Sequence, residues 1–332
     1  MKLLLGAIAI LLALLGIEIF LRVRFGFGHP LLYLADPEMG YRLAPNQTVK
    51  RFGNTIAINQ YSMRSGEITP ERSPTTFRIL LLGDSVANGG WWTDQSQTIS
   101  TLLQVQLQTQ IQTQVQNPAQ AKGNLSAALQ RAKLSTIEVL NASANSWSPR
   151  SEFPYLKQFG TFESQRIVLI INTDDLFATA PTDLVVGHDR NYPDRLPFLA
   201  LEEVITRYVL PAPKLSPQLQ AVYAEGGDRV GRNLQAIDQI HQMAQQHQAQ
   251  LLVILTPLLR EIETGSRNYE IDARQRLAQF LQDRTISFID CLPHFQAQSS
   301  PRSLYHDHIH LNPQGNQQIS DQIQQWLQQL QI

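Results

Sequence analysis

Five short apolar runs, which alternate with longer amphipathic stretches, dominate the sequence from Phe77 onward. The runs cover residues 77–82, 137–141, 166–171, 251–255 and 286–290. Runs of this length without strict alternation of apolar and polar residues are typical of strands buried on both faces of a parallel sheet. Strands separated by helices predict a doubly wound α/β fold with right-handed crossovers.

The stretches between these runs have helical periodicity. We expect Asp228 to cap one helix, and Asn312 with Pro313 to begin the last one. Residues 104–116 carry glutamine at every second position, but their apolar residues recur every fourth, so we expect a helix there as well. The expected apolar faces are Leu103, Leu107, Ile111 and Val115; Val230, Leu234, Ile237 and His241; Tyr269, Ala273, Leu277 and Phe280; and Ile319, Ile323, Trp326, Leu327 and Leu330.

The first 24 residues form a separate apolar segment. Residues 3–17 are apolar or glycine without interruption, and the run resumes after Glu18 until Arg22 and Arg24. About 20 apolar residues can cross a bilayer, so we expect a transmembrane anchor over residues 1–24 with Glu18 near the interface. A cleaved signal peptide is the main alternative, but bulky residues stand where small ones would mark a cleavage site. Apolar side chains all round the segment argue against a third interpretation, a buried core helix.

Two segments fall outside the pattern of strands and helices. Residues 25–76 contain five prolines and short apolar stretches, which predict an irregular connector with small strands packed on the main domain. Residues 183–215 carry four prolines around apolar residues, and we expect them to form an insertion over the edge of the sheet. The main domain is then expected over residues 77–332.

Composition excludes several classes of protein. The chain has 332 residues, a net charge of -1 from 27 basic and 28 acidic side chains, and a single cysteine, Cys291. A non-specific nucleic-acid binder needs an excess of basic residues, and a disulfide scaffold needs several cysteines. With 43% hydrophobic residues, the chain is too apolar for a disordered protein.

Ser85 is the first residue with a chemical signature. It ends the sequence Gly83-Asp84-Ser85 directly after the first apolar run, and parallel sheets bind ligands beyond the carboxyl ends of their strands. A hydroxyl at the beginning of a helix lies close to backbone N–H groups that favour developing negative charge. The simpler interpretation is that Ser85 only caps this helix, and the tripeptide alone does not separate the two.

A second signature precedes the last expected helix, where residues 306–313 read His-Asp-His-Ile-His-Leu-Asn-Pro. A serine hydroxyl becomes a good nucleophile when a base removes its proton, usually a histidine oriented by a carboxylate. Asp307 and His310 are three residues apart, so the carboxylate can reach the imidazole. His306, His308 and His310 with Asp307 are also potential zinc ligands, and a plain solvated loop is a further interpretation. Because the sequence has no second cluster at ligand spacing, we expect neither a metal nor a cofactor.

Two more polar stretches follow the second and third apolar runs. Residues 140–147 and 171–175 contain small, amide and acidic side chains. Such residues at neighbouring strand ends suit an oxyanion hole of backbone N–H groups and an amide donor. Ordinary turns have the same composition, so the stretches alone do not establish such a site.

Together these motifs resemble the SGNH/GDSL hydrolases, which are serine esterases and acyl-transferring relatives. Residues 83–85 (Gly-Asp-Ser) match the first block of that family and residues 307–310 (Asp-His-Ile-His) its last block, in the same order. The resemblance covers residues 77–332. Residues 59–64 (Asn-Gln-Tyr-Ser-Met-Arg) are similar to an element of membrane-anchored bacterial members. The resemblance implies a flavodoxin-like three-layer αβα sandwich with a parallel sheet of about five strands.

The resemblance also implies roles for individual residues. Ser85 is the expected nucleophile, His310 the base, and Asp307 the acid that orients it. The backbone N–H of Ser85 is one expected oxyanion donor. Ser146, with Ala144 as an alternative, stands where the family usually has a glycine that donates its backbone N–H.

This sequence departs further from the family pattern at the third block. Asp174 stands where the family usually has an asparagine amide, and a carboxylate repels an oxyanion unless it is protonated. Asn172 is the alternative donor. Because losing one donor typically lowers the rate about 10²–10³-fold, a catalytically degenerate, glycan-binding accessory protein of the cell envelope is the alternative to an active enzyme.

The function implied by the resemblance is hydrolysis or transfer of an acyl ester through an acyl-enzyme on Ser85. The expected substrate is an O-acetyl or similar ester on a cell-envelope glycan or lipid. The anchor predicts a single-pass membrane protein, and the resemblance favours a catalytic domain on the extracytoplasmic, periplasmic side. Trp91, Trp92 and residues 183–215 are candidates to line an acyl pocket, although simple packing also explains the tryptophans.

Overall fold

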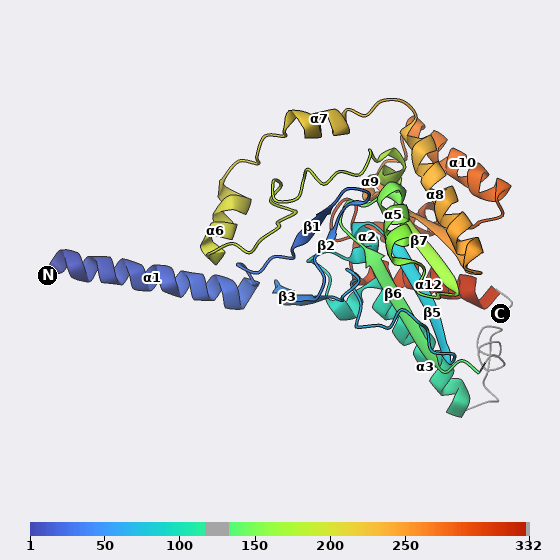
Figure 1. Cartoon of the computed structure of the whole chain (residues 1–332), viewed down its shortest axis with the longest axis horizontal. Coiled ribbons are helices and arrows are strands. Elements are labelled where there is room, and N and C mark those ends of the chain that lie inside the picture. The colour runs from blue at the N-terminus through green and yellow to red at the C-terminus, as the bar shows by residue number, and fades with distance from the viewer. Residues whose placement is uncertain (117–132, 330–332) are drawn as a thin grey trace.

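The structure is a computed structural model that describes residues 1–116 and 133–329, without the side chains of residues 114–116. Two layers of helices enclose a parallel sheet, and the N-terminal helix α1 (Lys2–Phe25) projects away from this body (Figure 1). Val115 and Leu330, which were expected on apolar helix faces, lie outside the described side chains.

All five expected strands are present in one parallel sheet. They are β5 (Thr76–Gly83), β6 (Thr136–Ser143), β7 (Arg166–Asn172), β8 (Gln250–Thr256) and β9 (Ser287–Asp290). Their order in the sheet is β6-β5-β7-β8-β9, with every neighbouring pair parallel. This is the flavodoxin-like order, which confirms the expected fold. The direction of winding reverses between β5 and β7, and ligands of such sheets bind at this point.

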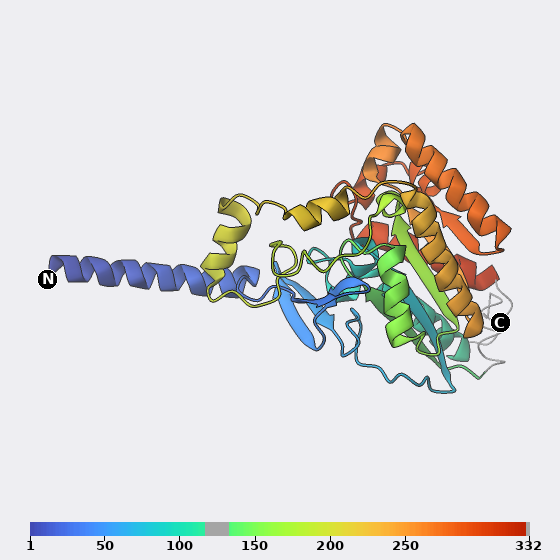
Figure 2. The same cartoon turned by 45° about the horizontal axis from the view of Figure 1, so that its top comes forward.

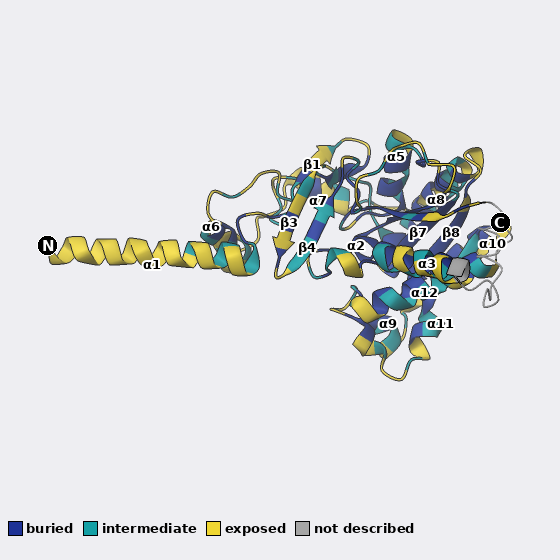
Figure 3. Cartoon of the chain, turned by 90° about the horizontal axis from the view of Figure 1, so that it is seen from below, coloured by how far each residue is buried: buried dark blue, intermediate teal, exposed yellow. Residues whose placement is uncertain are grey.

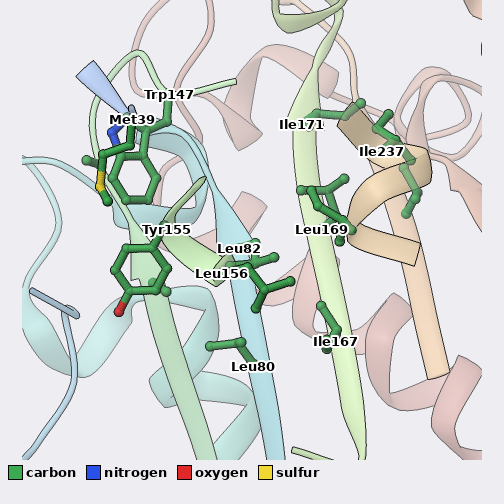
Figure 4. Packing of buried hydrophobic residues seen from close by; sticks show 14 of the residues in the cluster. Met39, Leu80, Leu82, Trp147, Tyr155, Leu156, Ile167, Leu169, Ile171 and Ile237 are labelled. Atoms are coloured by element: carbon green, nitrogen blue, oxygen red, sulfur yellow. The ribbon is translucent and has the colours of Figure 1, made fainter. Parts of the chain in front are cut away.

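Side chains that alternate along β5 separate the two cores of the sandwich. Leu80 and Leu82 face the layer of α5 (Pro149–Phe159), α8 (Arg229–Gln246) and α10 (Asn268–Asp283). Ile79 and Leu81 face the layer of α3 (Ile99–Gln116), α11 (Cys291–Gln296) and α12 (Pro313–Gln329). Figure 4 shows Leu156 of α5 close to Leu80 and Leu82 of β5. Burial on both faces explains why these strands lack polar alternation.

Shorter helical segments connect the strands and the long helices. They are α2 (Ser85–Asn88), η1 (Gln95–Gln97), η3 (Thr173–Phe177), α9 (Leu259–Glu263) and η5 (Pro301–Leu304). Three of them follow the carboxyl ends of strands: α2 follows β5, η3 follows β7 and α9 follows β8.

The predicted helix caps are confirmed. Asp228 accepts a 2.9 Å hydrogen bond from the N–H of Gly231, and the Asn312 side chain accepts from the first turn of α12. The prediction that Tyr269 lies on the apolar face of its helix is wrong. Tyr269 is exposed, because α10 buries Ala273, Leu277 and Leu281 instead. The helical period of 3.6 residues carries position 269 away from that face.

The connector contains two antiparallel hairpins. They consist of β1 (Tyr33–Asp36) with β2 (Gly40–Leu43) and β3 (Gln47–Arg51) with β4 (Asn54–Ile58). Met39, Leu43 and Ile56 are buried in the core that also holds Trp147 and Tyr155. Figure 4 shows Met39 beside Trp147, so side chains of the connector pack into the same core as the sheet.

Residues 183–215 were expected to lie over the edge of the sheet, and Val185 is indeed buried in the core that also holds Trp147, but the part around α6 (Ala200–Val204) lies at α1 instead (Figure 1). The helical parts of the segment after η3 are α6, a single π-helical turn η4 (Ile205–Val209) and α7 (Pro217–Tyr223). Figures 1 and 2 show α6 beside the end of α1. The carboxylate of Glu18 accepts hydrogen bonds from the N–H groups of Ala200 and Leu201, and these contacts hold the segment at α1.

The helix α1 is exposed along nearly its whole length (Figure 3). Its length, and a mean hydropathy of 2.7 over its most apolar 18 residues, are sufficient to cross a membrane. A single-pass anchor and a signal sequence both have these properties.

Candidate active site

Ser85 lies at the sharp turn between β5 and α2. The Asp84 side chain caps α2 by accepting a 2.8 Å hydrogen bond from the N–H of Val86, so Ser85 is not the cap. A Cβ atom at Gly83 would lie 2.6 Å from the carbonyl oxygen of Ile170 in β7, which explains the glycine before the turn. The turn therefore frees the Ser85 hydroxyl for other contacts at the point where the winding of the sheet reverses.

Asp307 and His310 lie in a closed loop before α12. The N–H of His306 donates a 2.8 Å hydrogen bond to the carbonyl of His310, and a β-bridge joins Tyr305 to Leu311. Asp307 Oδ1 accepts from the backbone N–H groups of Ile309 and His310 at 2.9 and 2.8 Å. The loop thus fixes both the carboxylate and the imidazole.

Ser85, His310 and Asp307 form one hydrogen-bonded chain, although Ser85 and His310 are 225 residues apart. The Ser85 Oγ atom lies 2.9 Å from His310 Nε2, and His310 Nδ1 lies 2.7 Å from Asp307 Oδ2. Burial opposes ionisation of Asp307, but hydrogen bonds from His310 and from the loop N–H groups outweigh it and lower the pKa of Asp307 to about 2. An ionised Asp307 favours the tautomer with the proton on Nδ1, which leaves Nε2 able to accept the serine proton.

The other histidines of the loop do not converge with His310. The His306 ring stacks on Trp92 with an interplanar angle of 6°, and the side chain of His308 is 81% exposed. Both nitrogens of His310 already have partners. Within residues 1–116 and 133–329, no three His, Cys, Asp or Glu side chains are grouped to hold a metal ion.

A pocket of about 460 Å³ opens beside Ser85 and His310. Trp91 and Trp92 line it, and the centroid of the Trp92 ring lies 4.2 Å from that of His310. The connector contributes Tyr33 and Phe52 among others. The segment after η3 contributes the side chains of Arg190, Asn191, Tyr192, Arg207 and Tyr208. Elements from outside the sandwich therefore form much of the pocket wall.

The loop after β6 brings Asn145 and Ser146 to this pocket. Ser146 has a φ of 58°, which is a left-handed conformation that glycine adopts most easily. Glycine is also the residue that the SGNH/GDSL hydrolases usually have at this position. The Asn145 Oδ1 atom is buried and has no hydrogen-bond partner among the described residues. We did not single out Asn145 from the sequence, and its only signal was an amide next to Ser146 in the stretch after the second apolar run.

Two tyrosines from outside the sheet hold this loop. Tyr41 of β2 donates a 2.7 Å hydrogen bond from its hydroxyl to the carbonyl of Asn145. The hydroxyl of Tyr192 donates to Ser146 Oγ at 2.9 Å, and Trp147 Nε1 donates back to the carbonyl of Tyr41 at 2.8 Å. The connector is thus part of the support for the candidate oxyanion loop.

Asn172 and Asp174, the other two expected oxyanion residues, are not among the residues that line the pocket. The Asn172 amide donates to Asp84 Oδ2 at 2.7 Å, and its Oδ1 atom accepts from the N–H of Asp174 at 2.7 Å. Asn172 and Asp175 form a capping box that begins η3. Asp174 is exposed in the first turn of η3. The side-chain amide of Asn172 is therefore engaged by Asp84 and by the cap of η3.

Arg64, from the element that resembles membrane-anchored family members, holds the turn after α2. Its buried guanidinium donates at 2.7 Å to the carbonyls of Asn88 and Gly90, and at 2.5 Å to that of Thr93. Burial lowers the pKa of Arg64 to about 10, which still leaves it charged at neutral pH. Arg64 thereby fixes the backbone around the two tryptophans of the pocket.

Three carboxyl groups are buried behind Ser85: those of Asp84, Glu152 and Asp175. Burial raises the pKa of all three, and the proximity of Asp84 raises the pKa of Glu152 further. Both carboxyl oxygens of Glu152 are buried without a hydrogen-bond partner among the described residues. A neutral, protonated Glu152 is therefore the form that the fold favours.

A doubly wound sheet with serine, histidine and aspartate hydrogen-bonded in series at its carboxyl edge defines a serine hydrolase of the three-layer αβα type. The chain belongs to the GDSL-like lipase/acylhydrolase family, whose model matches residues 81–318. Membership supports ester hydrolysis as its activity.

Solved structures of similar fold include several esterases. The acetyl xylan esterase AlAXEase is 13% identical, with a TM-score of 0.46 over 75% of this chain and 99% of its own. A member of the lipolytic protein G-D-S-L family from Veillonella parvula DSM 2008 is 11% identical, with a TM-score of 0.42 over 76% and 100%. The psychrotrophic esterase EstA from Pseudoalteromonas sp. is 14% identical, with a TM-score of 0.42 over 75% and 98%. No curated protein matches the sequence significantly.

Proposed function

We propose that this chain is a membrane-anchored serine esterase that forms an acyl-enzyme on Ser85. The observation that carries the proposal is the hydrogen-bonded chain from Ser85 Oγ through His310 to Asp307, which opens into a pocket of about 460 Å³. A nucleophile, a base and an orienting acid within hydrogen-bond distance are what acyl transfer through serine requires.

The reaction follows from these contacts in two halves. His310 Nε2 takes the hydroxyl proton as Ser85 Oγ attacks the ester carbonyl carbon, which gives a tetrahedral oxyanion. The intermediate expels the alcohol, whose oxygen receives the proton from His310, and the acyl group stays on Ser85. Water, or an acceptor hydroxyl, then gives its proton to His310 and attacks the acyl-enzyme, which gives a second tetrahedral intermediate. As this collapses, His310 returns the proton to Ser85 Oγ, which frees Ser85 and releases the acid or the new ester.

The oxyanion donors that we propose are the backbone N–H groups of Ser85 and Ser146 and the side-chain amide of Asn145. Support for Asn145 comes from its position in the pocket and from its buried Oδ1, because an amide with Oδ1 turned inward directs its NH2 group toward the pocket. Asn145 would then replace the asparagine that the family usually has in its third block, where this chain has Asp174. Such a donor is typically worth about 2.7–4 kcal/mol of transition-state stabilisation.

The substrate class that we propose is an acyl ester, such as an O-acetyl group, on a glycan or lipid of the cell envelope. The anchor α1 would keep the enzyme at a membrane, and the family resemblance favours the extracytoplasmic side. The aromatic lining of the pocket, which includes Trp92 and Phe52, suits an acyl chain or the face of a sugar ring.

Turnover of ester substrates tests the proposal. Full-length protein in detergent should release p-nitrophenol from p-nitrophenyl acetate and acetate from an O-acetylated polysaccharide. Ser85→Ala should lower kcat by several orders of magnitude, whereas Ser303→Ala, at an exposed position outside the pocket, should leave it unchanged. Folded protein that hydrolyses neither substrate, or a Ser85→Ala variant with normal turnover, would refute the esterase proposal.

A glycan-binding accessory protein is the second candidate, and the contact between the Asn172 amide and Asp84 favours it, because it leaves the third block of the family without a free amide donor. In that case Ser85→Ala should bind an O-acetylated polysaccharide as tightly as the wild type, and the wild type should release no acetate from it. Isothermal titration of both proteins, with acetate measured in the same samples, distinguishes a binder from an enzyme.

A further inference from the structure

Glu18 and Arg22 join the last turns of α1 to a segment that we call the collar, residues 196–210. The Glu18 carboxylate accepts from the N–H groups of Ala200 at 2.7 Å and Leu201 at 3.0 Å, and it pairs with Arg22 at 2.6 Å. Arg22 also donates to the carbonyl of Phe198 at 3.1 Å. The acidic residue within the apolar run therefore fixes the collar beside α1.

A buried glutamate secures the collar from its other side. The side chain of Glu203 is 5% exposed and accepts from Arg51 of β3 at 2.5 Å and from Arg207 at 2.9 Å. It also accepts from the N–H of Gly28, just after α1, at 2.7 Å. Glu203 and Arg207 thus face inward, and Glu203 ties the collar to both the connector and the end of α1. Glu202, in contrast, is exposed and accepts from the N–H of Phe198 within the collar.

The apolar side chains of the collar face outward instead. Phe198 is 88% exposed, Val209 71% and Tyr208 63%. Four more large apolar residues of the collar are exposed as well: Leu196, Leu199, Ile205 and Leu210. A group of large apolar side chains of this size is unusual on a surface that faces water and marks an interaction site.

We propose that the collar rests on the surface of the bilayer that α1 crosses, as a second membrane contact. The collar meets α1 at Glu18 and Arg22, in the same last turns of α1 where Phe20 and Val23 are exposed. Figures 1 and 2 show α6 at the edge of the domain from which α1 projects. Aromatic residues such as Phe198 and Tyr208, next to arginines, are typical of the interface between lipid and water.

The collar also belongs to the wall of the pocket, because Arg207 and Tyr208 line it together with Ser85. A collar that rests on lipid places the mouth of this pocket at the bilayer surface. The substrate is then an ester carried by a molecule of that surface, such as a lipid or a lipid-linked glycan. This consequence rests on the proposed esterase function, whereas the membrane contact itself does not.

Site-specific fluorescence in vesicles tests the contact without any catalysis. Cys291 is the only cysteine and is buried, so a thiol-reactive NBD dye labels introduced cysteines in the full-length chain. Leu11→Cys reports on α1, Phe198→Cys on the collar, and Val105→Cys, 58% exposed on α3, is the matched apolar control. The labelled proteins are reconstituted into phosphatidylcholine vesicles with and without doxyl-labelled lipid. Labels at positions 11 and 198 should be quenched by that lipid, and the label at 105 should not.

The other outcomes have distinct meanings. If the label at position 11 is quenched and the label at 198 is not, the collar contact is overturned and the anchor remains. If the unquenched label at 198 is also blue-shifted, a second copy of the protein covers the collar instead of lipid. No quenching at position 11 overturns the anchor and the collar contact together. A Phe198→Glu, Val209→Glu variant should hydrolyse a vesicle-borne ester severalfold more slowly while p-nitrophenyl acetate turnover stays normal. Equal loss on both substrates contradicts the surface-bound substrate.

Discussion

The hydroxyl of Tyr41 donates a 2.7 Å hydrogen bond to the backbone carbonyl of Asn145, 104 residues away in the sequence. Tyr41 belongs to the connector and Asn145 to the loop after β6, so the contact links the connector to the candidate oxyanion hole. The connector thereby acts on the geometry of the site although it supplies none of the three residues in the Ser85–His310–Asp307 chain.

Tyr41→Phe should lower kcat about threefold to tenfold with little change in KM. A hydrogen bond of this kind contributes about 0.5–1.5 kcal/mol, and its loss frees the Asn145 loop to move. Steady-state kinetics on p-nitrophenyl acetate measure the effect. Tyr155→Phe is the matched control, because Tyr155 also donates to the connector, at the carbonyl of Tyr61, but outside the pocket. Equal losses of kcat in both variants would mean that Tyr41 acts only through stability.

Asn145→Ala should lower kcat about 10²–10³-fold, as expected for removal of an oxyanion donor. Asp174→Asn should leave kcat unchanged, because Asp174 is exposed in η3 and outside the pocket. The two variants measured with the same ester separate the candidates directly. Normal turnover in Asn145→Ala, together with faster turnover in Asp174→Asn, would return the donor role to the third block of the family.

Asp307→Asn should lower kcat by on the order of 10⁴, because an amide holds the imidazole in the wrong tautomer. The fold should survive, since the Oδ1 atom of asparagine still accepts from the N–H groups of Ile309 and His310. Circular dichroism and kinetics on the same samples check both parts. Retained turnover would exclude Asp307 as the orienting acid.

The lowered pKa of Asp307 also predicts how stability depends on pH. The pKa of Asp307 is about 2 in the folded chain and about 3.9 in an unfolded one. The contribution of Asp307 is therefore complete above about pH 4 and lost as the pH falls toward 2. Thermal melts of wild type and Asp307→Asn should differ at pH 6 and converge at pH 2. A constant difference at all pH values contradicts this assignment.

Glu152→Gln should stabilise the protein at neutral pH. Burial and the nearby Asp84 raise the pKa of Glu152 well above the ordinary value of about 4.3. A raised carboxyl pKa costs stability as the pH rises above that ordinary value, so the gain in Tm should appear above about pH 5 and vanish near pH 4. The exposed Glu67→Gln controls for the loss of one charge. A variant less stable than wild type at every pH would show that the Glu152 carboxyl group makes a contact that the fold requires.

The sheet could be predicted from the sequence because its signals are local. Runs such as residues 77–82 and 251–255 are apolar throughout, and burial on both faces of a parallel sheet is the simplest cause. The caps at Asp228 and Asn312 are local as well, since the side chain and the N–H groups it binds lie within three residues. The two ends of the hydrogen-bonded chain, Ser85 and residues 307–310, were recognisable for the same reason.

The remaining features depend on contacts between distant segments. The role of Glu18 as a cap for α6 involves residues about 180 positions away, and no local pattern indicates it. Asn172 has the right side chain for an oxyanion donor, but Asp84 and the capping box of η3 engage its polar atoms. Asn145 was overlooked because only the fold shows that its amide lines the pocket.

Mapping the adduct of a fluorophosphonate probe tests the central claim, that His310 and Asp307 activate Ser85 as the nucleophile. Full-length protein is treated with the probe, digested, and analysed by peptide mass spectrometry. We predict a single phosphonylated residue, Ser85, whose modification is lost in Ser85→Ala and strongly slowed in His310→Ala. Absence of labelling in folded protein, or labelling of a different serine, would contradict the account.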